Sequence, residues 1–484
     1  MNSLFVTREC RLYALRELAK RAGVSPEFFR SWRIDWSADE MIVFLDSKAR
    51  ATVRFPSSPP VATAELLRRK VARLGWMANP STSVYEEVRE FVVPFASEGE
   101  TEVKPLFVRE KDAISCSLDL LASIALTLAR GEELTANAKD KHGRFPISAS
   151  QAYQGAFIDR PIVDEYGFAF EQAIAAAVPG WRARPRKLRV LVSHDVDHVG
   201  IPFNFRQTIG HVLRHRNLAA ATHDVLSLVS HSEPAYLALV MWMAEMEIVR
   251  GLDCEVYWKA SGKGKFDSGY DISTPAICKV VRNLRSRGIR QGIHPGYNTF
   301  RNAQLICGEA KRFSKVLGEE VLDGRQHYLR WDHETWLHYE AAGLLCDSTI
   351  GYADDVGFRA GTCVPYRPWL FSLNRESAVV EIPLLVMDQA LLDMSIADAM
   401  QMVSRLIARC RNVGGVFTLL WHNSNAVARR HRRLYAAILD RLAAERPARL
   451  PPSRVLQSEF LDLPSCQGVM RREVSNADSF RLGA

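Results

Sequence analysis

The sequence predicts an α/β protein in which a closed or nearly closed barrel of parallel strands follows a smaller α+β region. From residue 188 onward, short apolar segments alternate with longer segments of helical periodicity, the pattern of repeated βα units. About seven of these segments have strand character, which suits a barrel better than an open doubly wound sheet. The stretch 179–187 (PGWRARPRK) is typical of a boundary. We therefore expect an N-terminal α+β domain over 1–185, a barrel over 186–465 and a tail over 466–484.

The N-terminal region is expected to mix helices and strands. Segments 8–22, 113–130 and 168–177 place apolar residues on one helical face. Segments 40–45 and 51–55 have strand character. The stretch 139–166 is polar and contains glycine and proline, but it keeps aromatic residues. We interpret it as an ordered loop packed on the barrel.

In the barrel region, strands and helices are expected to alternate along the chain. The expected strands are 188–193, 252–259, 289–294, 320–326, 344–348, 379–383 and 416–422. The expected helices are 234–250, 274–287, 302–317, 333–342 and 395–413. No GxGxxG or P-loop spacing follows the first strand, so a dinucleotide or nucleoside triphosphate site is not expected.

Composition narrows the class of protein. Of the residues, 47% are hydrophobic and 24% charged, as in globular enzymes. The net charge of +8 comes from short, scattered basic stretches without a recognition motif, so nucleic acid is not an expected partner. No apolar stretch is long enough for a transmembrane segment. The first ten residues lack a secretory h-region, and the nine cysteines lack CxxC spacing, so we expect free thiols and a cytoplasmic location.

The first predicted strand ends in an unusual group of polar residues. Its apolar residues lead directly into the sequence SHDVDH, residues 193–198, which contains Asp195 and Asp197. Parallel strands of α/β enzymes carry their chemistry at their carboxyl ends. Two aspartates and two histidines at such an end are typical of a divalent metal site. A solvated polar loop is the alternative interpretation.

Further predicted strands end in residues of the same kind. They are His294 after the third strand, Arg325, His327 and Tyr328 after the fourth, Asp347 after the fifth and His422 after the seventh. Because strand ends meet at one rim of a barrel, we expect these side chains to converge. The set is typical of a mononuclear metallohydrolase, in which carboxylate and imidazole ligands hold an ion and a bound water. A second carboxylate and a further histidine would then serve as base and acid.

In their order along the chain, these motifs resemble the polysaccharide deacetylase family (NodB homology, carbohydrate esterase family four in its broad sense). The resemblance covers residues 188 to about 425. It implies a distorted seven-stranded (β/α) barrel and metal-dependent removal of acetyl groups from sugars. It also implies that Asp195 is the base and Asp197 a metal ligand. One residue separates the two acids here, and an exchange of their roles is the alternative.

The next two motifs depart from the family. His294 is followed four residues later by Asn298, where the family has a second histidine. In the sequence RQHY, residues 325–328, the resemblance implies that Arg325 orients the catalytic aspartate. His327 stands where the family has proline. The resemblance therefore leaves His327, Asn298 or a water molecule as the expected third metal ligand.

The remaining motifs lie toward the end of the barrel. His422, in LLWHN, matches the strand-end histidine that the resemblance identifies as the general acid. Asp347 and Tyr352 fall in a looser motif and are expected to shape the substrate pocket. Tyr297 and Tyr328 are expected to form pocket walls, since aromatic faces suit sugar rings.

The sequence thus favours a metal-dependent hydrolase that removes an acetyl group from an N-acetylated sugar. The expected cofactor is one divalent ion, zinc first, with cobalt or manganese as alternatives. The expected substrate is a nucleotide- or lipid-linked glycan precursor of surface polysaccharide. The N-terminal region resembles an accessory domain found before some bacterial deacetylase-like proteins. Two alternatives stay open: a C–N hydrolase of a non-sugar amide, similar to allantoinase, and an inactive carbohydrate-binding barrel.

Overall fold

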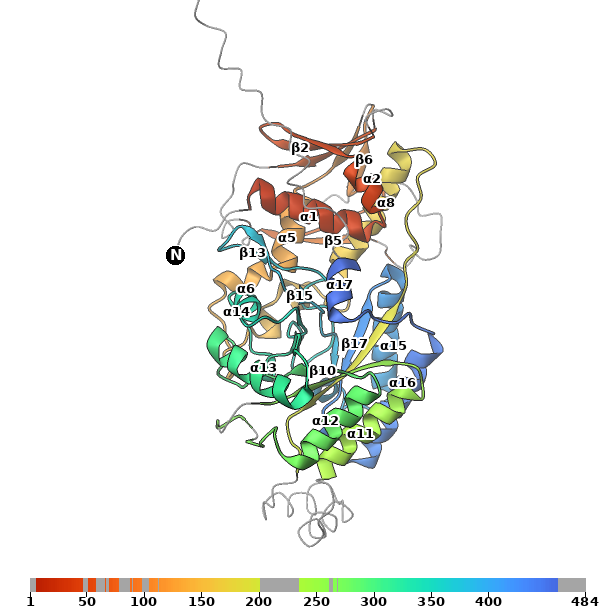
Figure 1. Ribbon diagram of the computed structural model, residues 1–484. Helices are drawn as coiled ribbons and strands as arrows, with labels where there is room; N and C mark the ends of the chain where they lie inside the picture. The colour runs from red at the N-terminus through yellow and green to blue at the C-terminus, as the bar shows by residue number, and fades with distance from the viewer. Residues whose placement is uncertain are drawn as a thin grey trace, which may run out of the picture.

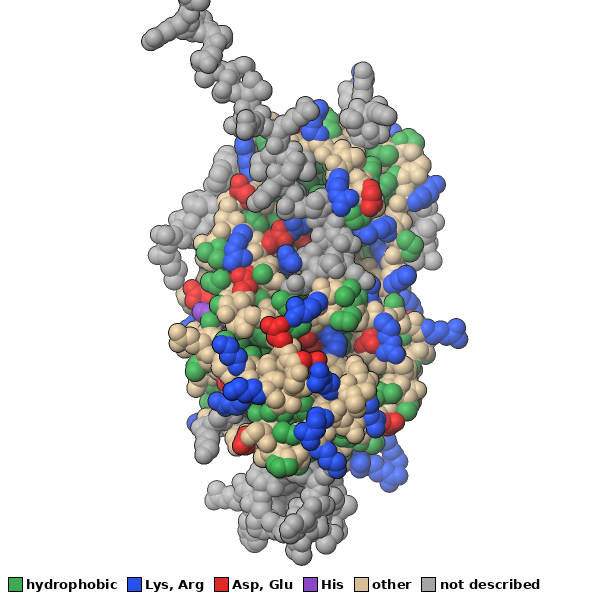
Figure 2. All heavy atoms as spheres, viewed as in Figure 1, with side chains coloured by type: hydrophobic (Ala, Val, Ile, Leu, Met, Phe, Trp, Pro, Cys, Tyr) green, Lys and Arg blue, Asp and Glu red, His purple; other side chains and the backbone are tan. Residues whose placement is uncertain are grey.

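A computed structural model describes residues 6–46, 51–57, 66, 69–77, 88, 90–97, 104–111, 113–200, 235–260, 264–267 and 269–459. The predicted tail 466–484 lies outside these residues. The N-terminal elements lie at one end of the molecule and the barrel at the other (Figure 1). On the face shown in Figure 2, Lys and Arg side chains are spread among apolar and acidic ones. Within the described part of the chain, no helix has the length and apolar character needed to cross a membrane.

The N-terminal part contains two small sheets. The larger has the order β1-β2-β3-β7-β6 and consists of β1 (Arg33–Trp36), β2 (Glu40–Asp46), β3 (Ala51–Pro56), β7 (Ile114–Cys116) and β6 (Phe107–Arg109). The smaller pairs β4 (Lys70–Leu74) with β5 (Phe91–Ser97). The helices are α1 (Arg8–Arg21), α2 (Pro26–Arg30), α5 (Leu120–Leu128), α6 (Gly131–Thr135), α7 (Gln151–Gln154) and α8 (Ile162–Ala177).

The predicted helix over 113–130 is wrong in its first part. Residues Ile114–Cys116 form β7, which pairs with both β3 and β6, so sheet pairing overrides the apolar periodicity there. The helix itself is α5, and the Asp119 side chain accepts a hydrogen bond from the Ala122 backbone N at its start. The predictions for α1, β2 and β3 are confirmed, and α8 begins six residues before the predicted 168–177.

The second part is built on one parallel sheet of eight strands. Its order is β15-β12-β11-β10-β9-β8-β17-β16. The strands are β8 (Arg189–Val196), β9 (Asp253–Trp258), β10 (Arg290–Ile293), β11 (Asp323–Gly324), β12 (Cys346–Asp347), β15 (Val380–Glu381), β16 (Val386–Met387) and β17 (Val416–Leu420). Each of the seven predicted strands has a counterpart in this sheet. The sheet also contains β16, which was not predicted, so the predicted count of seven strands is corrected to eight.

Helices surround this sheet, and a hairpin extends from it. The helices are α11 (Ala235–Ile248), α12 (Pro275–Ser286), α13 (Ala303–Leu317), α14 (Thr335–Ala341), α15 (Ile396–Val413), α16 (Arg429–Ala444) and α17 (Ser453–Glu459). The hairpin pairs β13 (Trp369–Leu370) with β14 (Arg375–Glu376). Apolar residues of α11, α12 and α13 pack with those of β9 and β10 in one buried cluster. The strands therefore present one face to these helices and the other to the barrel interior.

The sheet is curled until its two edges nearly meet. β15 and β16 lie at opposite edges, although only residues 382–385 separate them along the chain. At one end of this link, Ile382 N donates to Asp347 O of β12. At the other end, Leu385 N donates to Thr418 Oγ1 of β17, and that hydroxyl donates to Pro383 O. The link thus spans the gap between the edges and completes the barrel wall without strand pairing.

The N-terminal part packs directly on the barrel. One hydrophobic cluster contains side chains of α1, α5 and α8 together with side chains of the barrel, including Phe417 and Trp421. The stretch 139–166 is ordered and contacts the barrel, as predicted: Arg144 donates to Tyr328 O at 3.0 Å, and His142 Nδ1 lies 3.1 Å from Tyr297 Oη. This stretch therefore reaches the carboxyl ends of the strands.

Candidate functional site

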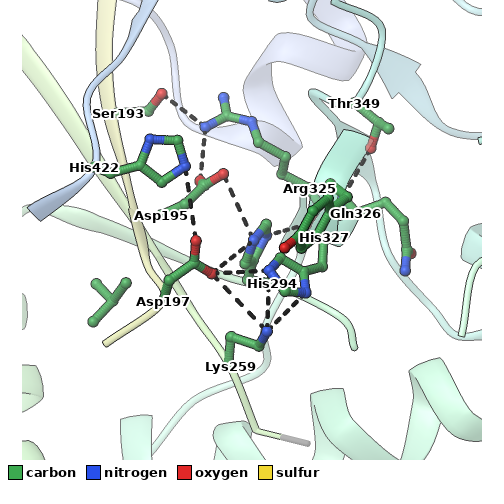
Figure 3. A network of polar contacts seen from close by, with 12 residues as sticks. Ser193, Asp195, Asp197, Lys259, His294, Arg325, Gln326, His327, Thr349 and His422 are labelled. Carbon is green, nitrogen blue, oxygen red and sulfur yellow. Dashed lines mark hydrogen bonds and ion pairs between the residues drawn. The ribbon is translucent and has the colours of Figure 1, made fainter. Parts of the chain in front are cut away.

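The side chains that follow the strands meet in one cavity of about 510 Å³. Asp195 and Asp197 come from β8 and the residue after it, His294 follows β10, His327 follows β11, and His422 lies just after β17. Figure 3 shows them pointing toward one another with Arg325 behind Asp195. The predicted convergence of the strand ends is therefore present in the fold.

Asp197 lies at the centre of three imidazole rings. Its Oδ1 atom is 3.5 Å from His294 Nε2 and 3.2 Å from His327 Nε2. Its Oδ2 atom is 3.8 Å from His422 Nε2. All three rings thus present the same nitrogen, Nε2, to one carboxylate.

The other nitrogen of each ring lies beside a hydrogen-bond acceptor. His294 Nδ1 lies 2.6 Å from the Arg325 carbonyl oxygen, and His422 Nδ1 lies 2.8 Å from Asp388 Oδ1. His327 Nδ1 lies 3.1 Å from Asp267 Oδ1. An acceptor at Nδ1 favours a ring proton there. When the rings of His294 and His327 are neutral, the lone pair of Nε2 therefore faces the cavity, as in metal-ligating histidines.

The residues present fit a divalent cation. One donor atom each from Asp197, His294 and His327 lies within 4.8 Å of the others. Asp197 Oδ1 is buried and has no hydrogen-bond partner among the described residues. A buried carboxylate oxygen without a partner is costly unless a cation satisfies it. Two imidazoles and one carboxylate form a ligand set typical of zinc with an open position.

Asp195 lies beside this cluster and is held by Arg325. Arg325 Nη1 lies 3.0 Å from Asp195 Oδ1 and 2.9 Å from Ser193 Oγ. The other two guanidinium nitrogens contact Ser348: Nε donates to the Ser348 carbonyl oxygen, and Nη2 donates to the Ser348 hydroxyl. Burial acts to raise the pKa of Asp195, but electrostatic interactions with His294 and with the Arg325 guanidinium outweigh burial and hold that pKa below its usual range. Asp195 is therefore a fixed, ionised carboxylate at the cavity floor.

His422 is held on the opposite side by Asp388. Asp388 accepts from the ring of His422 and, through Oδ2, from the His422 backbone N at 2.7 Å. Asn425 donates to the same Oδ2 at 2.9 Å. Burial opposes the charged ring, but Asp388 outweighs it and raises the pKa of His422 to about 10. His422 therefore carries a proton that it can donate near neutral pH.

Three residues of this site were not predicted from the sequence: Asp388, Lys259 and Asp267. Asp388 directly follows β16, in the apolar run IPLLVMD, so the rule of polar residues at strand ends could have found it. Lys259 directly follows β9 and could have been found in the same way. Asp267 lies in a short segment without any periodic pattern, and no sequence signal distinguishes it.

Several predicted residues lie outside the cluster. Asn298 is exposed, and its side-chain oxygen lies 3.3 Å from Arg330 Nη1, so the structure places it away from Asp197. Asp347 is buried next to the Thr349 hydroxyl and Glu381, behind the cavity wall. Tyr352 borders a smaller neighbouring cavity. These three side chains do not contact the space around His294 and Asp197.

Aromatic rings form one wall of the cavity. Tyr328 and Phe266 line it, and Tyr297 packs behind them with its ring 4.4 Å from that of Phe266. The backbone of Tyr328 has a φ of 61°, a left-handed conformation that is uncommon for a bulky residue. His142 of the N-terminal part packs against Tyr328, with 4.6 Å between the ring centroids. The N-terminal part thus supplies a portion of the cavity wall.

Comparisons with known proteins give limited matches. Residues 71–179 match a family of unknown function, DUF7033. No curated protein sequence matches this chain. Among solved structures, the chain is similar to a candidate polysaccharide deacetylase from Mycobacterium smegmatis, at 13% identity and a TM-score of 0.40, over 59% of this chain and 94% of that one.

Two further structures have lower TM-scores. The carbohydrate deacetylase Agd3 is 8% identical, with a TM-score of 0.36, and the match covers 90% of this chain and 68% of that one. Puue allantoinase is 10% identical, with a TM-score of 0.35, and the match covers 58% of this chain and 95% of that one.

Proposed function

We propose that this protein is a metal-dependent hydrolase that removes the acetyl group from an N-acetylated sugar. The observation that carries the proposal is the buried Asp197 Oδ1, which accepts no hydrogen bond from the described residues and faces Nε2 of His294 and Nε2 of His327. In this proposal Asp197, His294 and His327 hold one divalent ion. Zinc is our first choice because of the two imidazole ligands, with cobalt or manganese as alternatives.

The bound cation would supply an acidified water and polarise the acetamide carbonyl. Asp195 is the proposed base that takes the proton of that water, since it is ionised and lies 3.7 Å from His294 Nε2. Arg325 holds Asp195 in place and keeps it ionised. His422, oriented by Asp388, is the proposed acid that gives a proton to the departing amine nitrogen.

The proposed substrate is a glycan precursor, linked to a nucleotide or a lipid, in surface polysaccharide metabolism. The cavity volume of about 510 Å³ falls within the range of small-molecule sites. Tyr328 and Phe266 offer aromatic faces on which a sugar ring can pack. The motif resemblance to polysaccharide deacetylases supports the same substrate class.

The test combines metal analysis with an activity panel. We expect about one divalent ion per chain. We also expect the protein to release acetate from N-acetylhexosamine conjugates and not to open the ring of small ureides such as allantoin. Asp195→Asn should lower kcat by about 10²–10⁴-fold while the bound metal stays. Asp440→Asn, which changes an exposed carboxylate that does not line the cavity, is the matched control. Activity on ureides alone would favour the allantoinase-like alternative, and absence of metal uptake would favour an inactive barrel.

A further inference from the structure

A carboxylate that belongs to none of the motifs lies behind His327. Asp267 Oδ1 is 3.1 Å from His327 Nδ1 and 2.9 Å from Lys259 Nζ. The same oxygen accepts a hydrogen bond from the Tyr297 backbone N at 3.0 Å. Three donors around one oxygen stabilise the ionised form.

This contact determines which nitrogen of His327 faces the cluster. A neutral imidazole carries its proton on one nitrogen, and a carboxylate that accepts at Nδ1 favours the proton there. The Lys259 ammonium lies 2.8 Å from Nδ1 and 3.2 Å from Nε2, so it contacts both nitrogens of the ring, whereas Asp267 contacts Nδ1. Nε2 of His327 then has its lone pair free, 3.2 Å from Asp197 Oδ1. In His294, the Arg325 backbone carbonyl oxygen accepts from Nδ1 and so favours the ring proton on that nitrogen. A carboxylate behind a histidine also raises the basicity of the ring as a ligand.

Asp267 has a second effect, on charge. Lys259 is 1% exposed, and its ammonium lies 2.8 Å from His327 Nδ1 and 3.9 Å from Asp197 Oδ1. An isolated ammonium at this position would repel a divalent ion. Asp267 neutralises Lys259, so the pair adds no net charge beside the cluster. The hydrogen bond to His327 and the neutralisation of Lys259 can be separated by mutation.

We propose that Asp267 is a positioning residue that makes His327 the third metal ligand, in place of the histidine absent at position 298. The proposal rests on the metal site of the proposed function and not on its substrate. It assigns a role to the segment 264–267 after β9, which no motif covers. We attribute the main effect of Asp267 on metal affinity to its hydrogen bond with His327 rather than to the neutralisation of Lys259.

The experiment measures metal affinity, independent of catalysis. Dissociation constants of Zn²⁺ and Co²⁺ are determined by competition with a chromophoric chelator for four proteins. These are the full-length wild type, Asp267→Ala, the double variant Asp267→Ala/Lys259→Met and the control Asp354→Ala, whose side chain is 79% exposed. The visible absorption of bound Co²⁺ reports the ligand geometry, and the melting temperature of each metal-free protein reports folding.

We expect Asp267→Ala to bind both ions about 10–100-fold more weakly and to change the Co²⁺ spectrum. The double variant should stay at least about tenfold weaker than wild type, and the control should bind as wild type does. Wild-type affinity in Asp267→Ala overturns the proposal, and so does restored affinity in the double variant, which would make Asp267 only a counter-ion of Lys259. Tight wild-type binding without acetate release would overturn the proposed activity alone. A wild type that takes up neither ion would overturn the metal site and this inference together.

Discussion

At the scale of single residues, the site depends on buried charges that are held by several partners each. Arg325 is fully buried and forms hydrogen bonds with Asp195, Ser193 and Ser348. Its guanidinium also lies 4.4 Å from the centre of the Tyr257 ring. Burial of a charge is tolerated only when such partners replace water. The geometry of Asp195 is therefore inseparable from the packing of Arg325.

Arg325→Met should destabilise the protein by about 3–5 kcal/mol, because it leaves Asp195 as an uncompensated buried charge. The double variant Arg325→Met/Asp195→Asn should recover part of that loss, since it removes the charge as well. Urea unfolding of the single and double variants measures the coupling between the two residues. Additive losses would show that the two side chains do not depend on each other.

The pair of His422 and Asp388 predicts a pH effect. A proton donor with a raised pKa stays protonated through neutral pH and loses activity as the pH rises toward that pKa. Asp388→Asn removes the carboxylate that raises the pKa of His422, so the alkaline limb of the kcat profile should move to lower pH. We expect kcat to fall about 10²–10⁴-fold, the usual contribution of a general acid. The pH profiles of both proteins test this, and an unmoved alkaline limb would exclude His422 as the acid.

At the scale of elements, the ends of the strands lie close together because the sheet curls until its two edges nearly meet. The closure uses the link 382–385, in which two backbone groups are paired with one hydroxyl. Thr418 is 1% exposed, accepts from Leu385 N at 2.8 Å and donates to Pro383 O at 2.6 Å. Loss of that hydroxyl would leave two backbone groups without partners in the barrel wall.

Thr418→Val should therefore cost about 2–4 kcal/mol of folding free energy, as two buried backbone groups each lose their hydrogen bond. Thr418→Ser keeps the hydroxyl and is the matched control, with an expected loss of about 1 kcal/mol for the missing methyl group. Chemical denaturation measures both variants. Equal losses in the two variants would show that the hydroxyl is not what holds the link.

At the scale of the whole molecule, buried ion pairs join the N-terminal part to the barrel. Glu133 of α6 contacts Arg359 of the barrel at 2.7 Å and Arg130 at 2.8 Å. All three side chains are buried. Burial raises the pKa of Glu133, but the two arginines outweigh it and lower that pKa to about 2. The contact between the two parts therefore favours the ionised carboxylate.

The stability that Glu133 contributes to the folded protein depends on pH. Glu133 has a lower pKa when folded than when unfolded, so its stabilisation is complete above its ordinary pKa of 4.5 and is lost as the pH falls toward 2. Glu133→Gln should cost about 3–5 kcal/mol at neutral pH and show a smaller decline in stability over that acidic range. The control Glu319→Gln changes a half-exposed ion pair with Arg285 and should stay within about 0.5 kcal/mol. Unfolding curves between pH 2 and 7 give the comparison, and parallel declines in wild type and Glu133→Gln would contradict it.

The alternation of apolar and helical segments was sufficient to predict the strands of the barrel and the residues at their ends. Asp195, Asp197, His294, Arg325, His327 and His422 could be placed at one rim because parallel strands end together, whatever their separation along the chain. Other features of the site depend on the tertiary structure and cannot be predicted from strand ends alone. The position of His327 beside Asp197, the exposure of Asn298, the contact of His327 with Asp267 and the wall supplied by His142 depend on loop paths and side-chain rotamers. Those arise from packing between segments far apart in sequence, which no local periodicity records.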